Sequence, residues 1–270
     1  MGFDTRMQNL MFTAAVTVIS RAFVLRDRLL GRMKRERADA FEQPAQRCSI
    51  PSGSTRLDAV FVAPDGPPQA ALLICHGIGE IVDHWQGVQQ LLATRGIASL
   101  VFDYAGYGKS GGMVDWKQCE DDAVAAFAFL EKSAGGVPLS ILGFSMGSGI
   151  AAAIRSRIHA ERLILCAAFT SFRDAVCALG MPRSLCWMVA PIWSGEASLR
   201  GCAERVLVMH GGQDRVFPVR MAAELGKWCG DDAEVIIVPD QKHNEPFYRP
   251  KLSYWEHVVA RLVREVPLRT

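Results

Sequence analysis

One serine stands between two glycines where an apolar segment ends and a small-residue segment begins. The stretch ILGFSMGSGIA places Ser145 in the pattern Gly-x-Ser-x-Gly, with Gly143 and Gly147 two residues to either side. A sharp turn from a strand into a helix brings the backbone close together at both positions, where only glycine fits. The turn would hold the Ser145 hydroxyl outward at the positive end of a helix. The pattern indicates a nucleophile, and an ordinary helix N-cap remains the alternative.

A serine hydroxyl attacks a carbonyl only when a base lies beside it and a third group orients that base. Asp214 follows the apolar run VLVMHG by a few residues, and His243 follows the next run, VIIVPD, at a similar offset. Ligands bind at the carboxyl edge of parallel sheets, and all three loops should open onto that edge. The chain order Ser, Asp, His is the one that nucleophile-elbow hydrolases use. We therefore predict a triad of Ser145, Asp214 and His243.

Two other residues compete for these roles. His210 ends its own apolar run and could act as the base, but no acid follows it in the expected loop. Asp174, in FTSFRDA after the preceding run, could supply the carboxylate, because some triads take it from that position. The sequence contains no His, Cys, Asp and Glu cluster with metal-ligand spacing and no phosphate-binding glycine loop. We expect neither a metal nor a cofactor.

Acyl transfer also needs backbone donors for the oxyanion. One is the N–H of Met146, directly after the predicted nucleophile, and the second should come from the loop CHGIGEIVDHW. His76 and Gly77 allow a tight turn there, which places the N–H of Ile78 nearest to the serine. We predict that Ile78 and Met146 form the oxyanion hole.

Positioning these residues requires a sheet, and the chain from about Cys48 onward alternates strand-like and helix-like segments. The strand-like runs are LDAVFVAP, AALLIC, IASLVFDY, PLSILGF, RLILCAAF, RVLVMHG and EVIIVPD. Apolar runs without alternation are typical of strands covered on both faces. Segments such as EDDAVAAFAFLEKSAG are long enough to be parallel crossover helices. The pattern predicts an α/β fold with a mostly parallel central sheet and helices on both faces.

Five segments together resemble the α/β-hydrolase superfamily: HGIGE, FDYAGYGKSGG, GFSMGSG, HGGQDRVFP and KHNEPFY. The resemblance is greatest to the serine-esterase and lysophospholipase branch, which includes depalmitoylase-like members. It implies a sheet of about eight strands, the triad and oxyanion roles given above, and a structural loop from Asp103 to Gly112. Two departures stand out. Lys242 precedes the histidine where family members usually have glycine, and the segment after the sixth strand leaves room only for a short helical lid.

The predicted lid carries several large apolar residues, of which Trp187 and Met188 are our candidates for an acyl-binding wall. Core packing is the alternative for some of them. With these roles the sequence predicts a serine hydrolase that cleaves esters or thioesters of small or lipid-like acyl compounds through an acyl-enzyme. A peptidase of the same fold and a catalytically silent binding module are the two alternatives.

Composition narrows the class further. The net charge is +2 and no basic tract is interleaved with aromatic residues, which argues against nucleic acid as a partner. The eight cysteines include no Cys-x-x-Cys pair, and Cys75 and Cys166 stand inside apolar runs. Cysteines in such runs behave as small buried apolar residues, so we expect reduced thiols.

The first forty residues differ from the rest, and we divide the chain into an N-terminal segment, 1–40, and a hydrolase domain, 41–270. The uncharged run from Met7 to Ser20 is shorter than the roughly 20 residues of a spanning helix. Phe12, Val16 and Ile19 recur at helical spacing, ahead of a basic cluster. Such a helix could lie on an anionic membrane or pack on its own domain or a second copy. We expect a cytoplasmic protein, which could contact a membrane through this N-terminal segment.

Overall fold

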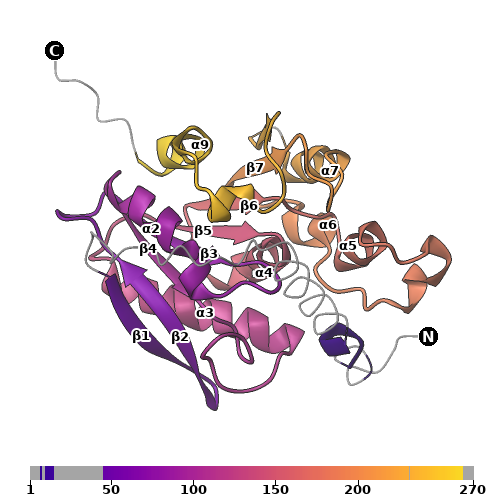
Figure 1. Cartoon of the computed structure of the whole chain (residues 1–270), viewed down its shortest axis with the longest axis horizontal. Helices are drawn as coiled ribbons and strands as arrows, with labels where there is room; N and C mark the ends of the chain where they lie inside the picture. The colour runs from indigo at the N-terminus through magenta and orange to yellow at the C-terminus, as the bar shows by residue number, and fades with distance from the viewer. Residues whose placement is uncertain (1–6, 8–9, 15–44, 231, 264–270) are drawn as a thin grey trace.

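The computed structural model describes residues 7, 10–14, 45–230 and 232–263. Eight strands form one sheet in the order β1-β2-β4-β3-β5-β6-β7-β8 (Figure 1). The strands β4, β3, β5, β6, β7 and β8 run parallel, whereas β1 and β2 are antiparallel to their neighbours. Their bounds are β1 Ala45–Ser52, β2 Thr55–Val62, β3 Ala70–Cys75, β4 Ile97–Phe102, β5 Leu139–Phe144, β6 Arg162–Cys166, β7 Arg205–Gly211 and β8 Glu234–Val238.

The central strands are buried on both faces, which explains their unbroken apolar sequences. Every residue of β3 and β4 is buried, and in β5 only the first residue is partly exposed. The edge strand β1 is exposed at most positions, as expected for an antiparallel strand with one solvated face. The predicted α/β architecture with a mostly parallel sheet is confirmed.

Helices cover the two faces of the sheet and divide the core in two. Residues of α2, α8 and α9 pack with Leu72 and Ile74 on one face, and residues of α3, α4 and α7 pack with Leu73 on the other. The helix bounds are η1 Val82–Trp85, α2 Gln86–Ala93, α3 Trp116–Ser133, α4 Met146–Ile154, η2 Arg155–Arg157, α5 Phe172–Ala178, η3 Arg183–Met188, α6 Gly195–Leu199, α7 Arg220–Cys229, α8 Glu245–Tyr248 and α9 Leu252–Leu262.

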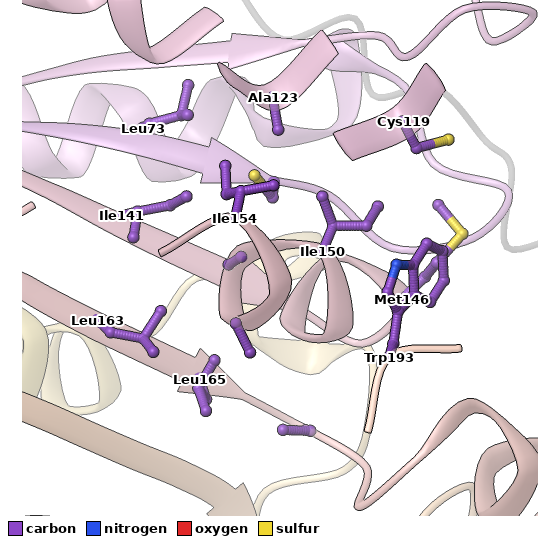
Figure 2. Packing of buried hydrophobic residues seen from close by; sticks show 14 of the residues in the cluster. Leu73, Cys119, Ala123, Ile141, Met146, Ile150, Ile154, Leu163, Leu165 and Trp193 are labelled. Carbon is purple, nitrogen blue, oxygen red and sulfur yellow. The ribbon is translucent and has the colours of Figure 1, made fainter. Parts of the chain in front are cut away.

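The helix α4, which follows Ser145, consists mostly of small residues and is buried along nearly its whole length. Figure 2 shows Ile154 of this helix beside Ile141 of β5, with Ile150 one turn away on the same helix. On its outer side, a Cβ atom added at Gly149 would lie only 2.8 Å from the Phe169 ring and 2.9 Å from Cβ of Trp193. The small-residue sequence therefore fixes α4 between the sheet and the segment that follows β6.

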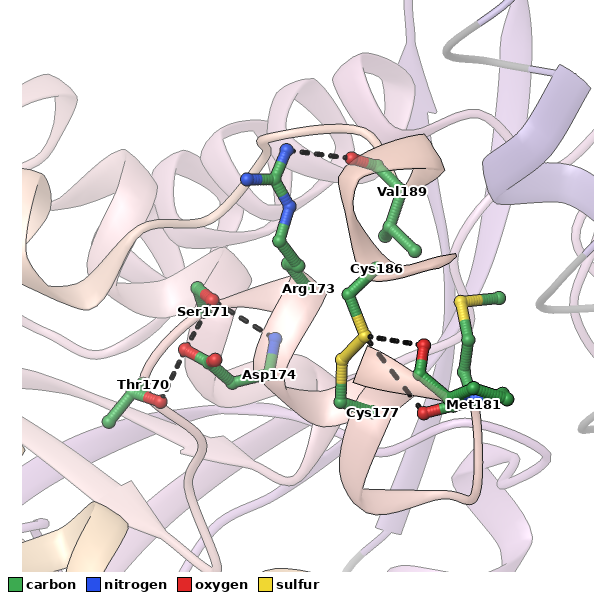
Figure 3. The surroundings of a disulfide bond; sticks show 9 residues. Thr170, Ser171, Arg173, Asp174, Cys177, Met181, Cys186 and Val189 are labelled. Carbon is green, nitrogen blue, oxygen red and sulfur yellow. Dashed lines mark hydrogen bonds between the residues drawn. A yellow bond between two sulfur atoms is a disulfide. The ribbon is translucent and has the colours of Figure 1, made fainter. Parts of the chain in front are cut away.

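Residues 167–204, between β6 and β7, form a short helical insert that contains α5, η3 and α6. Inside it, Cys177 and Cys186 form a disulfide bond with a Cα–Cα distance of 6.4 Å (Figure 3). Our expectation of reduced thiols is wrong for this pair, whereas the six other cysteines are free. The two cysteines are nine residues apart and meet because η3 folds back on α5. A fold-back of this kind is not visible in their spacing.

Part of the N-terminal segment packs into the main core. Phe12, in a described helical stretch, is fully buried, and its ring centroid lies 5.3 Å from that of Phe172 and 5.2 Å from that of Trp193. The Thr13 hydroxyl donates to the Val114 carbonyl at 3.0 Å. Val16 and Ile19 lie outside the described residues, and the division at residue 40 stays a prediction. Within the described part of the chain, no helix is both long and apolar enough to span a membrane.

These contacts predict that Phe12→Ala lowers the free energy of unfolding by about 3–5 kcal/mol, the usual cost of removing a buried phenylalanine. Urea denaturation of the full chain measures the change. The neighbouring Leu10 is 65% exposed, so Leu10→Ala is the matched control and should leave the midpoint nearly unchanged. Equal midpoints for the two variants would show that Phe12 lies outside the core.

Candidate active site

The turn at Ser145 is a strained elbow between β5 and α4. Ser145 has φ 51° and ψ −117°, a left-handed conformation that costs a residue with a Cβ of order 1–3 kcal/mol. Its N–H donates to the Cys166 carbonyl at 3.0 Å, which ties the turn to the end of β6. A Cβ atom at Gly143 would collide with the Gly147 carbonyl, and one at Gly147 would collide with the Cys75 carbonyl. Only glycine fits at both positions, as the pattern predicts.

The three residues predicted to act together are in contact. Nε2 of His243 lies 3.0 Å from the Ser145 hydroxyl oxygen, and Nδ1 of His243 lies 2.7 Å from Oδ2 of Asp214. Ser145 and His243 are 5% and 7% exposed, and the Asp214 side chain is fully buried. Since an ionised carboxylate only accepts hydrogen bonds, Nδ1 carries the proton and Nε2 is left to accept the serine proton. The geometry is that of a nucleophile, a base and an orienting acid.

Several donors hold Asp214 in its ionised form. Its Oδ1 accepts the backbone N–H groups of Val216 at 2.7 Å and Phe217 at 2.9 Å. Burial alone would raise the pKa of this carboxyl, but the hydrogen bond and charge interaction with His243, together with the Phe217 N–H, lower the pKa below its ordinary value. The carboxylate is thus charged and fixed in place when it faces the imidazole.

Neither competing residue takes a triad position. His210 is fully buried, and its Nε2 donates to the Phe217 carbonyl at 3.0 Å and lies 3.4 Å from Oδ2 of Asp214. Burial lowers the pKa of His210, so it supports the acid as a neutral ring. The Asp174 carboxylate accepts from the hydroxyls of Thr170 at 2.8 Å and Ser171 at 2.6 Å, at the start of α5 (Figure 3). Asp174 therefore lies in the first turn of α5, where its carboxylate bonds to the hydroxyl of the N-cap residue Ser171.

The two predicted oxyanion donors belong to segments that reach Ser145. Met146 is the first residue of α4, and the first four N–H groups of a helix have no partner within it. The loop after β3 reaches the elbow at Gly77, where a Cβ atom would lie 3.1 Å from Cβ of Ser145. Ile78 follows directly. The assignment of both residues to an oxyanion hole stays a prediction that this placement supports.

A buried glutamate that our sequence reasoning did not single out supports this loop. Oε2 of Glu80 accepts the Gly77 N–H at 2.9 Å and the Trp85 indole N–H at 3.0 Å. Burial raises the pKa of Glu80 to about 7, although His76, both N–H donors and His243 oppose the shift. The only signal in the sequence is an acidic residue inside an otherwise apolar, glycine-containing stretch, HGIGE.

The loop predicted to be structural, which starts at Asp103, contacts the segment that follows β3. Oδ1 of Asp103 accepts the N–H of Val82, the first residue of η1, at 2.8 Å. A Cβ atom at Gly108 would collide with the Asp103 carboxylate, which explains a glycine with φ +48° there. The loops after β3 and β4 are therefore fixed to each other.

The predicted acyl-wall residues lie on η3 and are largely exposed. Trp187 is 62% exposed and Met188 is 41% exposed. The aromatic rings next to the triad are instead those of Phe144 and Phe217, whose centroids lie 5.5 Å and 5.2 Å from that of His243. The role of Trp187 and Met188 in binding an acyl chain stays a prediction. No group of three or more His, Cys, Asp or Glu residues in the described ranges could hold a metal ion.

Known protein families and curated proteins that resemble this chain include hydrolases. A family model described as "Serine aminopeptidase, S33" matches residues 66–197, which include Ile78, Ser145 and Met146. The lysophosphatidylserine lipase ABHD12 of Gallus gallus is 25% identical over 208 residues, which cover 68% of this chain and 54% of the relative. This chain thus spans about half the length of that relative. The uncharacterized protein YfhR of Escherichia coli O157:H7 is 27% identical over 204 residues, covering 72% of this chain and 71% of the relative.

Solved structures share the fold at lower identity. The Pyrococcus furiosus esterase Pf2001 superposes with a TM-score of 0.66 at 17% identity, covering 83% of this chain and 92% of the esterase. An α/β hydrolase from Vibrio vulnificus gives a TM-score of 0.67 at 21% identity and covers 80% of both chains. The family match, the curated relatives and the fold agree: the chain has the fold of the α/β hydrolases and is similar in sequence to members of that superfamily.

Proposed function

We propose that this protein is a serine hydrolase that cleaves carboxylic esters or thioesters through an acyl-enzyme on Ser145. The observation that carries the proposal is the pair of hydrogen bonds of His243, 3.0 Å to the serine and 2.7 Å to Asp214. Three loops that are far apart in the sequence deliver these side chains to one edge of the sheet. A helix N-cap would require neither the histidine nor the buried acid.

Acylation begins when Nε2 of His243 takes the Ser145 proton as the serine oxygen attacks the substrate carbonyl carbon. The carbonyl oxygen becomes negative and accepts hydrogen bonds from the backbone N–H groups of Ile78 and Met146. Asp214, hydrogen-bonded to Nδ1, stabilises the imidazolium that forms. The tetrahedral intermediate then collapses, and His243 returns the proton to the departing alcohol or thiol. An acyl group remains on Ser145.

Deacylation repeats the sequence with water. His243 takes one proton from water, the hydroxide attacks the acyl carbon, and the same two N–H groups hold the oxyanion. Collapse releases the carboxylic acid while the proton returns to the serine oxygen. No step requires a metal or a cofactor.

The names of the relatives suggest a class of substrate. The curated relative ABHD12 is named a lysophosphatidylserine lipase, and the structural neighbour Pf2001 is named an esterase. These names favour a small or lipid-like acyl ester. The family model is described as a serine aminopeptidase, which keeps amide cleavage as the second candidate. A panel of p-nitrophenyl esters, a thioester and aminoacyl amides separates these classes.

Ser145 should be the one serine that reacts with a fluorophosphonate probe, because only its hydroxyl bonds to His243 among the serines that the structure describes. The wild type should be labelled, and Ser145→Ala should not. Ser171→Ala, which removes a capping hydroxyl of α5, is the control and should be labelled fully. Labelling of the Ser145→Ala protein would end the proposal, and an unlabelled, folded wild type would favour a binding module.

Replacing Asp214 by Asn should reduce kcat by a factor on the order of 10⁴, because the amide favours the wrong imidazole tautomer. Asp174→Asn is the matched control, since this carboxylate bonds only to the start of α5 among the contacts described. It should change kcat by no more than about threefold. Steady-state turnover of a soluble ester measures both. The reverse order of effects would move the acid to Asp174.

Trp187 and Met188 are proposed to contact the acyl chain, as the exposed apolar surface of η3. Each methylene that is buried is worth about 0.8 kcal/mol, so kcat/KM should rise about fourfold per methylene until the contact ends. Trp187→Ala should flatten this rise, whereas Met113→Ala, at another position that is 83% exposed, should not. A length series of esters that is equally steep in the Trp187→Ala protein would exclude this role.

A further inference from the structure

We propose that Glu80 is a positioning residue that, by holding the Gly77 peptide against the core, directs the Ile78 N–H at the substrate oxyanion. The inference rests on the proposed function and extends it to a residue outside the triad. Glu80 lies in the loop between β3 and η1 and is 5% exposed. Its side chain makes no described hydrogen bond to Ser145 or His243, and its bond to the Gly77 N–H connects it to the loop backbone, to which we assign its effect.

Gly77 is enclosed on two sides. A Cβ atom there would lie 2.5 Å from Oε1 of Glu80 and 3.1 Å from Cβ of Ser145. The residue therefore fits between the glutamate and the nucleophile, and any movement of the carboxyl group changes the distance between this loop and the elbow.

Both polar groups of Gly77 are held. Its N–H donates to Oε2 of Glu80 at 2.9 Å. Its carbonyl oxygen lies 2.8 Å from Nδ1 of His76 and accepts the Glu80 N–H at 3.4 Å. The Gly77 carbonyl and the Ile78 N–H belong to one planar trans peptide, in which they point in opposite directions. Because the carbonyl is held toward His76, the Ile78 N–H must point away from it.

The second hydrogen bond of Glu80 connects this loop to the core. The same Oε2 accepts the indole N–H of Trp85, which is fully buried. The Trp85 ring lies 5.3 Å from that of Phe247, 5.6 Å from that of Phe144 and 6.2 Å from that of Trp255. Glu80 thus connects a loop that contains two glycines to a packed aromatic cluster, which restricts the movement of the loop.

Hydrogen-bond acceptance, rather than charge, is the property that this role needs. The charged or titratable groups that act on Glu80 are His76 and His243, and Asp103 lies 3.5 Å from Nε2 of His76. Both donors use one oxygen, Oε2, so a proton on Oε1 leaves both bonds intact. A glutamine can place its carbonyl oxygen at the position of Oε2 and keep them as well.

The test compares Glu80→Met, which removes the acceptor at similar volume, with Glu80→Gln. Gln89→Met is the matched control, because Gln89 is also buried and bonds to two backbone carbonyls, those of Val60 and Ser99. Turnover of a soluble p-nitrophenyl ester is measured per mole of Ser145 that a fluorophosphonate titrates. This normalisation removes any loss of folded protein from the comparison.

We expect kcat of Glu80→Met to fall at least about tenfold with KM nearly unchanged, because an oxyanion bond is made only in the transition state. Glu80→Gln should recover most of this loss, and Gln89→Met should keep kcat within about twofold of the wild type while losing stability. A wild-type kcat in Glu80→Met, an equal loss in Gln89→Met, or a Glu80→Gln protein as slow as Glu80→Met would each overturn the inference. Absence of turnover and labelling in the wild type would instead overturn the proposed function.

The pH dependence of thermal stability tests whether the carboxyl group of Glu80 is buried. Its raised pKa, about 7, means that the folded state keeps a proton that the unfolded chain releases near its ordinary value. This contribution favours the fold at low pH and is lost as pH rises toward the folded pKa. The Tm of Glu80→Gln should therefore rise relative to wild type between about pH 5 and pH 8. A constant difference would place Glu80 in solvent and contradict the contacts on which the inference depends.

Discussion

The strained turn at Ser145 is the constraint on which the rest of the site depends. A residue with a side chain is held at φ 51°, and its N–H is bonded to the end of β6. The conformation is tolerated because β5 before it is buried and α4 after it is packed on both sides. It also requires glycine at Gly143 and Gly147, where the backbone of the elbow and the end of β3 come within contact distance. The fold thus stabilises a turn that presents one hydroxyl.

Other loops acquire their positions from the same sheet edge. The loops after β7 and β8 bring Asp214 and His243 together, and backbone N–H groups fix the acid on the side away from the imidazole. The loop after β3 is held by Glu80 and, at Val82, by Asp103, which follows β4. Three buried acidic side chains, those of Asp214, Glu80 and Asp103, therefore accept loop N–H groups at this edge of the sheet. Such bonds let glycine-containing loops keep one conformation without regular secondary structure.

Much of this arrangement could be predicted from the sequence. Unbroken apolar runs predict strands buried on both faces, and the position of Ser145, Asp214 and His243 after such runs predicts their convergence, since strand ends share an edge. Side-chain contacts between segments on either side of a turn are harder to predict from the sequence. The bond between Cys177 and Cys186 depends on how η3 folds back on α5, and the burial of Phe12 depends on an aromatic cluster supplied by Phe172 and Trp193. Periodicity alone does not distinguish such a residue from one that faces a membrane.

The central claim is that a substrate acyl group becomes covalently attached to Ser145. Rapid acid quenching of the wild type during turnover of a p-nitrophenyl ester, followed by peptide mass spectrometry, tests it directly. We predict a mass increase equal to the acyl group on the peptide that contains Ser145, and no such increase in the His243→Ala protein, which lacks the base. Turnover with no adduct at any time point, or an adduct on a different residue, would contradict the account.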